Sequence, residues 1–444
     1  MAVPPLATLI LAAGKGTRMK SRMPKVLHAL CGRPMLGHVL EAAAAVSPTR
    51  RLVVVGHEAE NVKASFPEGV EFVLQPEQRG TGHAVLQCRE PLAGFRGDAL
   101  ILYGDTPLLR GETIAALQRH KQQTRADLVM LTAEVDVPGI VLRDAAGAVE
   151  RIVEVPDATP EQRRIAERNT GVYLLDADLL FKLLAQVGDD NAQGEIYLTD
   201  IVELAVREGL RIEALALEDP DEALGVNTRA QLAQAAAAMR RRILNRLMED
   251  GVTVIDPAST FVDVDVEVGA DSVIEPGCVI HGPTRIGEGV QIRSHCTIES
   301  SEIGDDVVLG PCAHIRPDCV IGRGSRIGNY VEVKNSILGE GVKADHLSYI
   351  GDADVGEGAS FGCGSIVVNY DGIAKHRSSI GARAFVGCNV NLVAPITIEP
   401  DTFLAAGSTI TRPVPGDALA VARARQKNVE GWVSRRRRDT DSEE

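Results

Sequence analysis

The sequence predicts two fold classes in series: an α/β Rossmann-like domain, then a left-handed parallel β-helix of hexapeptide repeats. Three observations lead to this prediction. The first half alternates short apolar segments with helical ones, which is typical of a mostly parallel sheet covered on both faces. Positions 231–248 contain neither Gly nor Pro and are rich in Ala, Leu and Arg, which predicts one connecting helix. After Gly251, aliphatic residues recur every six positions over about 150 residues, the period of a hexapeptide β-helix.

The first half supplies the elements of the predicted sheet in order. We expect strands at Ala7–Leu11, Leu52–Val55, Ala99–Tyr103 and Leu128–Ala133. Helices should lie between them, for example at Met35–Ala45 and Thr81–Cys88. Sheets of this kind bind ligands outside the carboxyl ends of their strands. We assign the α/β domain to 1–228, the connecting helix to 229–250, the β-helix to 251–422 and a C-terminal tail to 423–444.

The repeat in the second half predicts both its core and a loop. Aliphatic residues at the repeat position should point inward and stack from coil to coil, with a small residue four places on near each corner. Three of the eight cysteines, Cys278, Cys296 and Cys319, occupy that small slot, so packing explains them without a metal or a disulfide. The series breaks once, between Val367 and Ile380. An insertion that leaves the register intact indicates a functional loop.

Composition excludes several classes of protein. The chain has 444 residues, 45% hydrophobic and 24% charged, with a formal net charge of −14. That charge argues against nonspecific nucleic-acid binding. No apolar run is long enough to span a bilayer, and Gly14 follows Leu6–Ala13 at once, which indicates a buried strand and not a signal peptide. We therefore expect a cytoplasmic protein without membrane or nucleic-acid partners, and a solvated tail at Arg435–Arg438.

A glycine-rich turn after the first predicted strand is the first chemical feature. Residues 11–19 read Leu-Ala-Ala-Gly-Lys-Gly-Thr-Arg-Met. Gly14 and Gly16 let the backbone approach a phosphate, and backbone N–H groups at a helix N-terminus favour an anion. Arg18 and Lys25 add positive charge. Taken alone, this pattern is equally compatible with an ordinary tight turn.

Further motifs follow in the order found in sugar-phosphate nucleotidyltransferases: Pro24-Lys25, Gln75, Gly80-Thr81-Gly82, Tyr103-Gly104-Asp105, Glu154, Asn169-Thr170-Gly171 and Gly225-Val226-Asn227. With the six-residue repeat behind them, residues 6–432 resemble the bacterial bifunctional N-acetylglucosamine-1-phosphate uridylyltransferase/glucosamine-1-phosphate N-acetyltransferase family. The resemblance implies an enzyme that acetylates glucosamine-1-phosphate from acetyl-CoA and then transfers a uridylyl group from UTP to the product. Pyrophosphate would leave, and UDP-N-acetylglucosamine would supply cell-wall and lipopolysaccharide precursors.

In the α/β domain the resemblance assigns catalytic roles to Arg18 and Lys25, which would neutralise the triphosphate. Asp105 and Asn227 would bind Mg²⁺, which typically keeps water and phosphate ligands beside one or two protein oxygens. UTP and the sugar would contact Leu11, Ala12, Ala13, Gly14, Lys25, Gln75, Gly80, Thr81, Tyr103, Gly104, Asp105, Gly139, Glu154, Asn169 and Asn227. One departure bears on sugar affinity and loop geometry: the family's Arg is missing after Gly139.

In the β-helix the resemblance makes His346 the general base that takes the proton of the attacking amine. The amino-sugar phosphate would contact Arg316, Lys334, Tyr349 and Ser360, and acetyl-CoA would contact Cys363, Asn369, Tyr370, Cys388, Ala406 and Arg423. Two residues depart from the family pattern. Ser360 occupies a position where the family usually has Asn, which predicts weaker amino-sugar binding. Cys388 occupies a position where Ser is common. For Cys363 and Cys388, we favour burial in the small-residue slot over a reactive role.

The resemblance also implies a homotrimer, because a β-helix coil is open along its sides and a neighbouring chain can complete a site there. Two other functions compete with the bifunctional enzyme. One is a nucleotidyltransferase whose β-helix serves only assembly or regulation, which His346, Arg316 and Lys334 argue against. The other is a noncatalytic scaffold, which Lys25 and Asp105 argue against.

Overall fold

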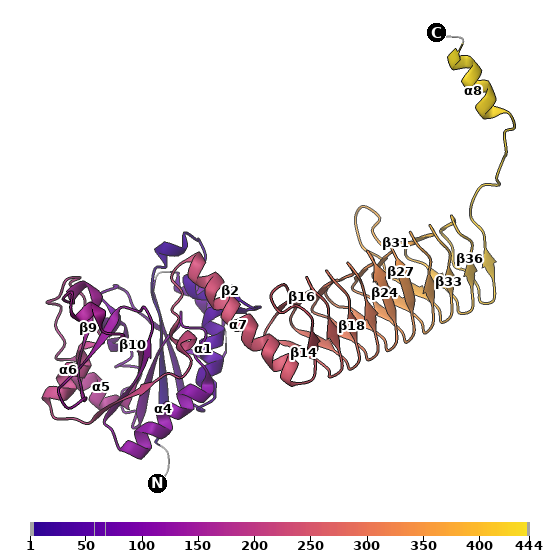
Figure 1. Ribbon diagram of the computed structural model, residues 1–444. Helices are drawn as coiled ribbons and strands as arrows, with labels where there is room; N and C mark the ends of the chain where they lie inside the picture. The colour runs from indigo at the N-terminus through magenta and orange to yellow at the C-terminus, as the bar shows by residue number, and fades with distance from the viewer. Residues whose placement is uncertain (1–3, 57, 67, 442–444) are drawn as a thin grey trace. The chain divides into compact units, whose positions relative to one another are not determined.

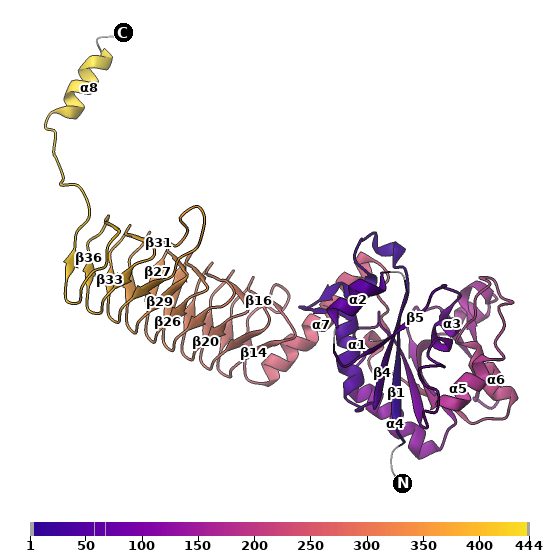
Figure 2. The same ribbon diagram turned by 180° about the vertical axis from the view of Figure 1, so that it is seen from behind.

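The structure is a computed structural model that describes residues 4–56, 58–66 and 68–441. The chain forms two compact units that divide after Arg242 (Figures 1 and 2). The first is an α/β sheet with helices around it, and the second is built from short parallel strands in three stacked sheets. Both predicted fold classes are therefore confirmed. Among the described helices, none is long and apolar enough to cross a membrane.

The sheet of the first unit contains all four predicted strands. It has the order β11-β7-β10-β6-β1-β4-β5, with bounds β11 Ile212–Ala216, β7 Leu128–Glu134, β10 Glu167–Asp176, β6 Asp98–Tyr103, β1 Leu6–Ala12, β4 Arg50–Val55 and β5 Glu71–Leu74. Most neighbours are parallel, but β10 runs antiparallel to both β6 and β7. Two further strands, β8 (Gly139–Arg143) and β9 (Val149–Glu154), extend from β10 as an antiparallel hairpin.

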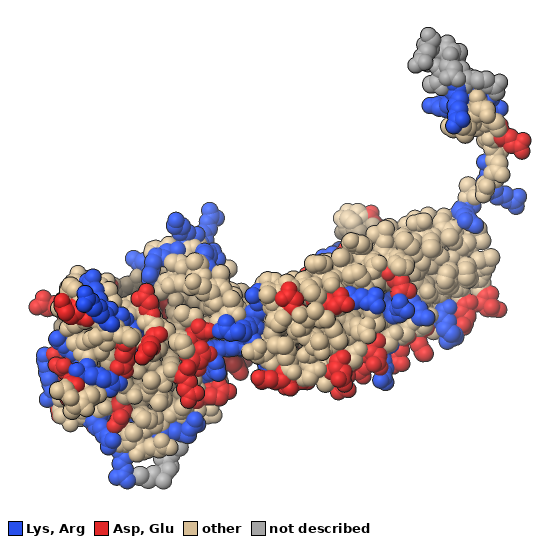
Figure 3. Space-filling view, viewed as in Figure 1, with Lys and Arg blue, Asp and Glu red and all other residues tan. Residues whose placement is uncertain are grey.

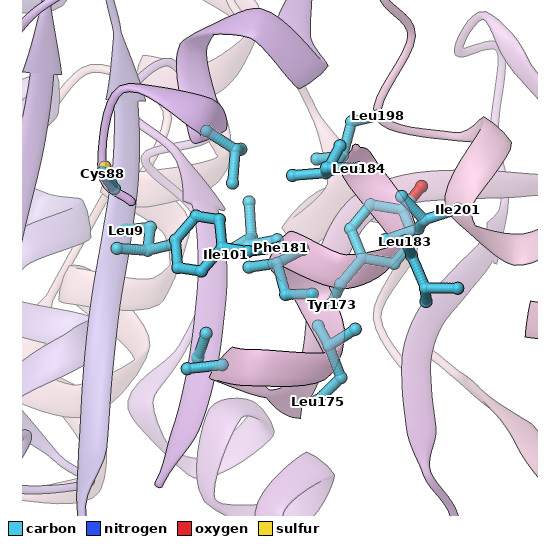
Figure 4. Packing of buried hydrophobic residues seen from close by; sticks show 14 of the residues in the cluster. Leu9, Cys88, Ile101, Tyr173, Leu175, Phe181, Leu183, Leu184, Leu198 and Ile201 are labelled. Atoms are coloured by element: carbon cyan, nitrogen blue, oxygen red, sulfur yellow. The ribbon is translucent and has the colours of Figure 1, made fainter. Parts of the chain in front are cut away.

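Helices lie on both faces of this sheet. They are α1 Met35–Ala44, α2 Ala59–Ser65, α3 Thr81–Leu86, α4 Gly111–Thr124, α5 Ala177–Leu184 and α6 Asp200–Arg207, followed by α7 Arg229–Glu249. Residues of β1 alternate between two hydrophobic clusters, with Leu9 in one and Ile10 in the other. Figure 4 shows Leu9, Ile101 and Phe181 of the first cluster packed together. Burial on both faces explains why the strands read as continuous apolar runs.

Each coil of the second unit has three sides, and equivalent sides stack into three parallel sheets. The first side runs from β12 (Thr253–Val254) to β38 (Leu419–Ala420), the second from β13 (Phe261–Val262) to β37 (Thr409–Ile410), and the third from β14 (Val266–Val268) to β35 (Thr397–Ile398). We call the junction of the first and second sides the first corner, and that of the second and third sides the second corner. Figure 3 shows acidic and basic side chains along one edge of this unit.

The strands that carry the predicted polar residues occupy two sides. On the first side they are β24 Arg326–Asn329, β27 Lys343–His346, β30 Ser360–Phe361, β33 Phe385–Val386 and β36 Phe403–Leu404; on the second side they are β22 His314–Ile315, β25 Glu332–Lys334, β28 Tyr349–Gly351 and β31 Ile366–Val368.

The inward residues of the repeat form the core, as predicted. The aliphatic series from Val262 to Ile410 is buried except at Val268, which is half-buried. Cys278, Cys296 and Cys319 are buried in the small slot.

Two segments leave the β-helix. The predicted insertion projects as a loop beside β31 (Figures 1 and 2), where Tyr370 and Lys375 form an isolated β-bridge. The C-terminal tail ends in helix α8 (Trp432–Asp441), which the sequence analysis did not predict. Arg435, Arg436 and Arg437 are exposed on it, and Figure 3 shows basic side chains gathered there.

Candidate active sites

Two adjoining cavities lie at the carboxyl ends of the parallel strands β1 and β6. The first has a volume of about 290 Å³ and the second about 660 Å³, and Thr81, Tyr103 and Asp105 line both. The first is also lined by Leu11, Ala12, Ala13, Gly14, Lys25, Gln75 and Gly80, and the second by Arg18, Gly139, Glu154, Asn169 and Asn227. Gly104 lines neither cavity, but its N–H donates to the Leu11 carbonyl at 2.9 Å. The predicted residues of this site therefore converge.

Three of the predicted sugar residues form one row across neighbouring strands. Gly139 of β8 is in register with Asn169 of β10 on one side and with Glu154 of β9 on the other. The Asn169 amide donates to the Tyr173 hydroxyl at 2.7 Å and is buried, which fixes its orientation. Ile140, at the position where the family's Arg is missing, is fully buried in the core.

The cation-binding residues meet at the boundary of the two cavities. The Lys25 ammonium donates to the Asp105 carboxylate, with which it forms an ion pair, and to the Asn227 carbonyl oxygen at 2.8 Å. An internal cation thus lies between the two side chains expected to hold Mg²⁺, and a carboxylate with an amide oxygen is a suitable donor set for that metal. Within the described parts of the chain, no group of three or more His, Cys, Asp or Glu side chains could hold a metal. The site would therefore need phosphate and water ligands.

Burial sets the electrostatics of the larger cavity. It raises the pKa of Glu154, although the Thr199 hydroxyl partly opposes the shift by donating to the Glu154 carboxylate at 3.2 Å. Burial and the charge of Glu203 raise the pKa of Asp200 to about 6. Burial also raises the pKa of Tyr197 to about 12. Glu154, the group among these that lines the cavity as a carboxylate, thus ionises less readily than a free carboxylate.

The structure adds residues that the sequence analysis did not select. Gln78 lines the smaller cavity and donates to the Ala13 carbonyl, while Glu195 lines both cavities. Tyr197 and Thr199 line the larger one. Gln78 follows Gln75 by three positions in the same loop, a signal that could have identified it. Nothing in the local sequence pattern marks the other three.

In the β-helix, three cations gather on the second side near the second corner. The Arg316 guanidinium donates to the Glu332 carboxylate at 2.9 Å, and the Lys334 ammonium lies 3.4 Å from the Asp352 carboxylate. The third cation is Lys375 of the inserted loop. The Lys334 ammonium next to it lowers the pKa of Lys375, and Arg316 lowers it to a smaller extent. The sequence analysis did not select Lys375, although it identified the loop. Three cations facing two carboxylates form a site suited to a small dianion.

Asp352 organises this cluster from a buried position. Burial alone would raise the pKa of Asp352, but hydrogen bonds from Asn335 and Asn369 and the charge of Lys334 outweigh it and lower the pKa. Asn369 also donates to the Tyr349 hydroxyl at 3.2 Å. Asp352 therefore remains ionised and holds the predicted residues Lys334 and Asn369 together.

The ring of Tyr349 lies flat along the second side, over Gly351. A Cβ at Gly351 would be 2.4 Å from the Tyr349 hydroxyl oxygen, so only glycine leaves room for the ring. Gly351 is in register with Lys334, which places the ring beside the cation cluster. The predicted sugar contact and the predicted phosphate contacts are therefore adjacent.

His346 and three predicted acetyl-CoA residues form one column along the first corner. The pairing of β27 with β30 carries His346 into register with Cys363, and the pairing of β30 with β33 carries Cys363 into register with Cys388. Pairing of β33 with β36 adds Ala406. All four residues are exposed. Coils are spaced by about 4.8 Å, so the column extends over about 14 Å from His346.

The expected burial of Cys363 and Cys388 is wrong. Both cysteines are free and exposed, because they occupy the outward position of the corner, while Ser365 fills the buried slot beside Cys363 and Val390 fills the one beside Cys388. Ser360 lies on the first side, in register with Lys343, and not with the cation cluster on the second side. Tyr370 is exposed on the loop and donates to the Gly372 carbonyl at 2.7 Å. Arg423 is exposed beyond β38.

A strand-end cavity in an α/β unit and a cation cluster on a hexapeptide β-helix define a two-site transferase. Residues 8–192 match the MobA-like NTP transferase domain, and residues 253–355 match the GMPPB C-terminal domain.

The chain is 48% identical to the bifunctional protein GlmU of Pelobacter propionicus, over 98% of this chain and 99% of that protein. It is 47% identical to the bifunctional protein GlmU of Halalkalibacterium halodurans, over 96% of this chain and 98% of that protein. It is also 47% identical to the bifunctional protein GlmU of Geobacillus thermodenitrificans, over 97% of this chain and 98% of that protein. The chain belongs to the bifunctional GlmU family and is an enzyme.

Proposed function

We propose that this enzyme makes UDP-N-acetylglucosamine in the cytoplasm by two reactions at separate sites. The β-helix transfers an acetyl group from acetyl-CoA to glucosamine-1-phosphate. The α/β unit then transfers a uridylyl group from UTP to N-acetylglucosamine-1-phosphate and releases pyrophosphate. The observation that carries the first-unit assignment is the pair of adjoining cavities, because one holds the glycine-rich turn and the other holds the row of Asn169, Gly139 and Glu154.

Uridylyl transfer requires the enzyme to bring two polyanions together. The sugar phosphate is already an anion, so its oxygen attacks the α-phosphorus of UTP without a protein nucleophile. Arg18 and Lys25 offset the repulsion between the two substrates. Glu154 and Asn169 orient the sugar, and the buried Gln75 at the smaller cavity orients the base.

Mg²⁺ would be held by Asp105 and Asn227. When bound, the metal supplies charge neutralisation at the phosphates. Lys25 now forms the cation contact with both side chains. With the metal held there, the Lys25 ammonium would be available to neutralise phosphate charge beside it.

In acetyl transfer, Arg316, Lys334 and Lys375 bind the phosphate of glucosamine-1-phosphate, and Tyr349 contacts the sugar. The amine attacks the thioester carbonyl of acetyl-CoA, and His346 takes the amine proton. Coenzyme A leaves as the thiol. The column of Cys363, Cys388 and Ala406 offers one wall along which the extended pantetheine arm of acetyl-CoA would lie, with Arg423 near its far end.

A homotrimer would complete this second site. The column at the first corner is exposed along its length, so it forms one wall only, and a neighbouring β-helix would supply the other. Ser360 would then meet a substrate bound to a neighbouring chain. A mass measurement in dilute solution that finds a monomer with full acetyltransferase activity would refute the trimer.

The separate half-reactions test the proposal directly. With acetyl-CoA and glucosamine-1-phosphate but no UTP, the purified chain should release coenzyme A. No release would leave a nucleotidyltransferase whose β-helix serves assembly. His346→Ala should abolish acetyl transfer while uridylyl transfer from UTP and N-acetylglucosamine-1-phosphate persists. Loss of both activities in a folded His346→Ala protein would contradict two independent sites.

A further inference from the structure

The inserted loop holds Lys375 through the residues on either side of it. The Asp371 carboxylate accepts hydrogen bonds at 2.8 Å from the backbone N–H groups of Ile373 and Ala374. Its second oxygen lies 2.7 Å from Nε2 of His376, and since a carboxylate only accepts, that nitrogen carries the hydrogen. One carboxylate therefore fixes both the residue before Lys375 and the residue after it.

Both ends of the loop are fixed as well. At its start, Asn369 is buried and donates to the Asp352 carboxylate of the cation cluster. The Asn369 carbonyl also accepts from the backbone N–H of His376 at 2.8 Å. At its end, the Arg377 guanidinium donates to the Asp354 carboxylate at 2.7 Å. The His376 ring thus adds a side-chain bond to a hairpin whose ends are already held, so the ring can be changed without releasing the loop.

We propose that His376 is a positioning residue for acetyl transfer, which acts through Asp371 to hold Lys375 at the phosphate of glucosamine-1-phosphate. This inference rests on the proposed function, in which Lys375 binds that phosphate. The hydrogen bond from Ala374, followed by the one from His376, lowers the pKa of Asp371. The carboxylate therefore stays charged, and the hydrogen bonds that it accepts are charge-assisted.

The position of Lys375 needs this support because the other cations of the cluster repel it. Lys334, and Arg316 to a smaller extent, lower the pKa of Lys375, which expresses that repulsion. A lysine ammonium also stands on a flexible four-carbon stem, so its reach to one point depends on where the backbone carries it. With the backbone held by Asp371, less of the binding free energy is lost to ordering the loop when the phosphate binds.

The test measures the KM and kcat of acetyl transfer by the full chain in two variants of His376. His376→Phe keeps a ring and removes the donor, whereas the amide N–H of His376→Gln stands near the place of Nε2. His376→Phe should raise the KM for glucosamine-1-phosphate about fivefold with an unchanged kcat, because one hydrogen bond is typically worth roughly two- to tenfold in an equilibrium. His376→Gln should keep the KM close to that of the unchanged chain.

Ile373→Ala is the matched control on the same loop. The Ile373 side chain is 93% exposed, and the substitution leaves the backbone N–H that donates to Asp371 in place. The KM for glucosamine-1-phosphate should therefore stay unchanged in Ile373→Ala.

A second pair of variants tests whether His376 acts through Lys375. Lys375→Met should raise the same KM at least about tenfold, as expected for the loss of a charge-assisted contact to phosphate. When Lys375→Met is already present, adding His376→Phe should raise the KM no further, because residues that act as one unit are not additive.

Three results would overturn the inference. An unchanged KM in His376→Phe, or an equal further rise when Lys375→Met is already present, would mean that His376 does not position Lys375. A loss of kcat with an unchanged KM in His376→Phe would place the residue at the reacting atoms instead. All three leave the proposed acetyl transfer standing, whereas an unchanged chain that releases no coenzyme A would refute both.

Discussion

Gly171→Ala should destabilise the first unit and disturb its active site through Tyr103. Gly171 lies in β10 where the register with β7 shifts between Asn169 and Tyr173, and its φ is +83°. A Cβ there would be 2.4 Å from Cε2 and 3.0 Å from Cδ2 of the Tyr103 ring. Tyr103 lines both cavities, so the ring cannot yield without moving into the substrate space.

The magnitude has two parts. A left-handed backbone costs an L residue about 1–2 kcal/mol, and forcing a methyl group against a rigid, packed ring costs about 1–3 kcal/mol more. The free energy of unfolding should thus fall by about 2–5 kcal/mol in Gly171→Ala. Gly147 provides a matched control, because it has a φ of +84° and nothing within 4 Å of an added Cβ. Gly147→Ala should lose only the backbone part, about 1–2 kcal/mol.

Urea unfolding followed by far-ultraviolet circular dichroism measures this difference, because helices α1 to α6 all belong to the first unit. Fluorescence would not report it, since the single tryptophan of the chain, Trp432, lies in the second unit. Uridylyl transfer should show a raised KM for both substrates in Gly171→Ala and an unchanged KM in Gly147→Ala. Equal destabilisation of the two variants would refute the packing of Tyr103 against Gly171.

Three further predictions concern pH, the core and the metal site. The pKa of Asp200 is raised from 3.8 to about 6, so the folded chain binds its proton more tightly than the unfolded chain, and the free energy of unfolding should fall as pH rises from about 4 to about 6. Asp200→Asn should remove that fall and stabilise the first unit by about 2 kcal/mol at pH 7, because solvent screening reduces the roughly 3 kcal/mol that the full shift would give; urea unfolding across pH measures the change. In the β-helix, Ile298→Ala should lower the free energy of unfolding by about 3 kcal/mol, because Ile298 is 0% exposed. Ile337→Ala is the control: Ile337 is 50% exposed, so its loss should be under about 1 kcal/mol. Equal losses in thermal unfolding would contradict the inward stack. Asp105→Asn should raise the Mg²⁺ concentration for half-maximal uridylyl transfer at least about tenfold, with acetyl transfer unchanged as the control.

The β-helix was predictable because its stabilising contacts repeat along the chain. Each inward aliphatic residue, such as Ile298 or Ile315, meets the equivalent residue of the next coil, so a period in the sequence corresponds directly to a column in space. The glycine-rich turn after β1 was predictable for a similar reason. Phosphate binding at a strand end needs a short local arrangement of backbone and charge, which residues 11–19 display in sequence.

The antiparallel strand β10 was not predictable from periodicity. It lies between β6 and β7, although it follows both in the chain, and only sheet topology brings Asn169 into the row with Gly139 and Glu154. The motifs assigned these residues to one pocket by resemblance, and the strand pairing gives the physical reason that they meet.

The sequence by itself determined the two fold classes, because the alternation of apolar and helical segments and the six-residue period are local patterns of burial, while the residues of both sites came from the family resemblance. The tertiary structure decided which of those residues are neighbours. Steps of unequal length around the loop insertion obscure the register that aligns His346, Cys363 and Cys388, and only the strand pairing reveals it. The exposure of Cys363 and Cys388 likewise depends on which way the first corner turns. Cysteine usually favours burial, but both of these residues lie at the surface, in the same column as His346.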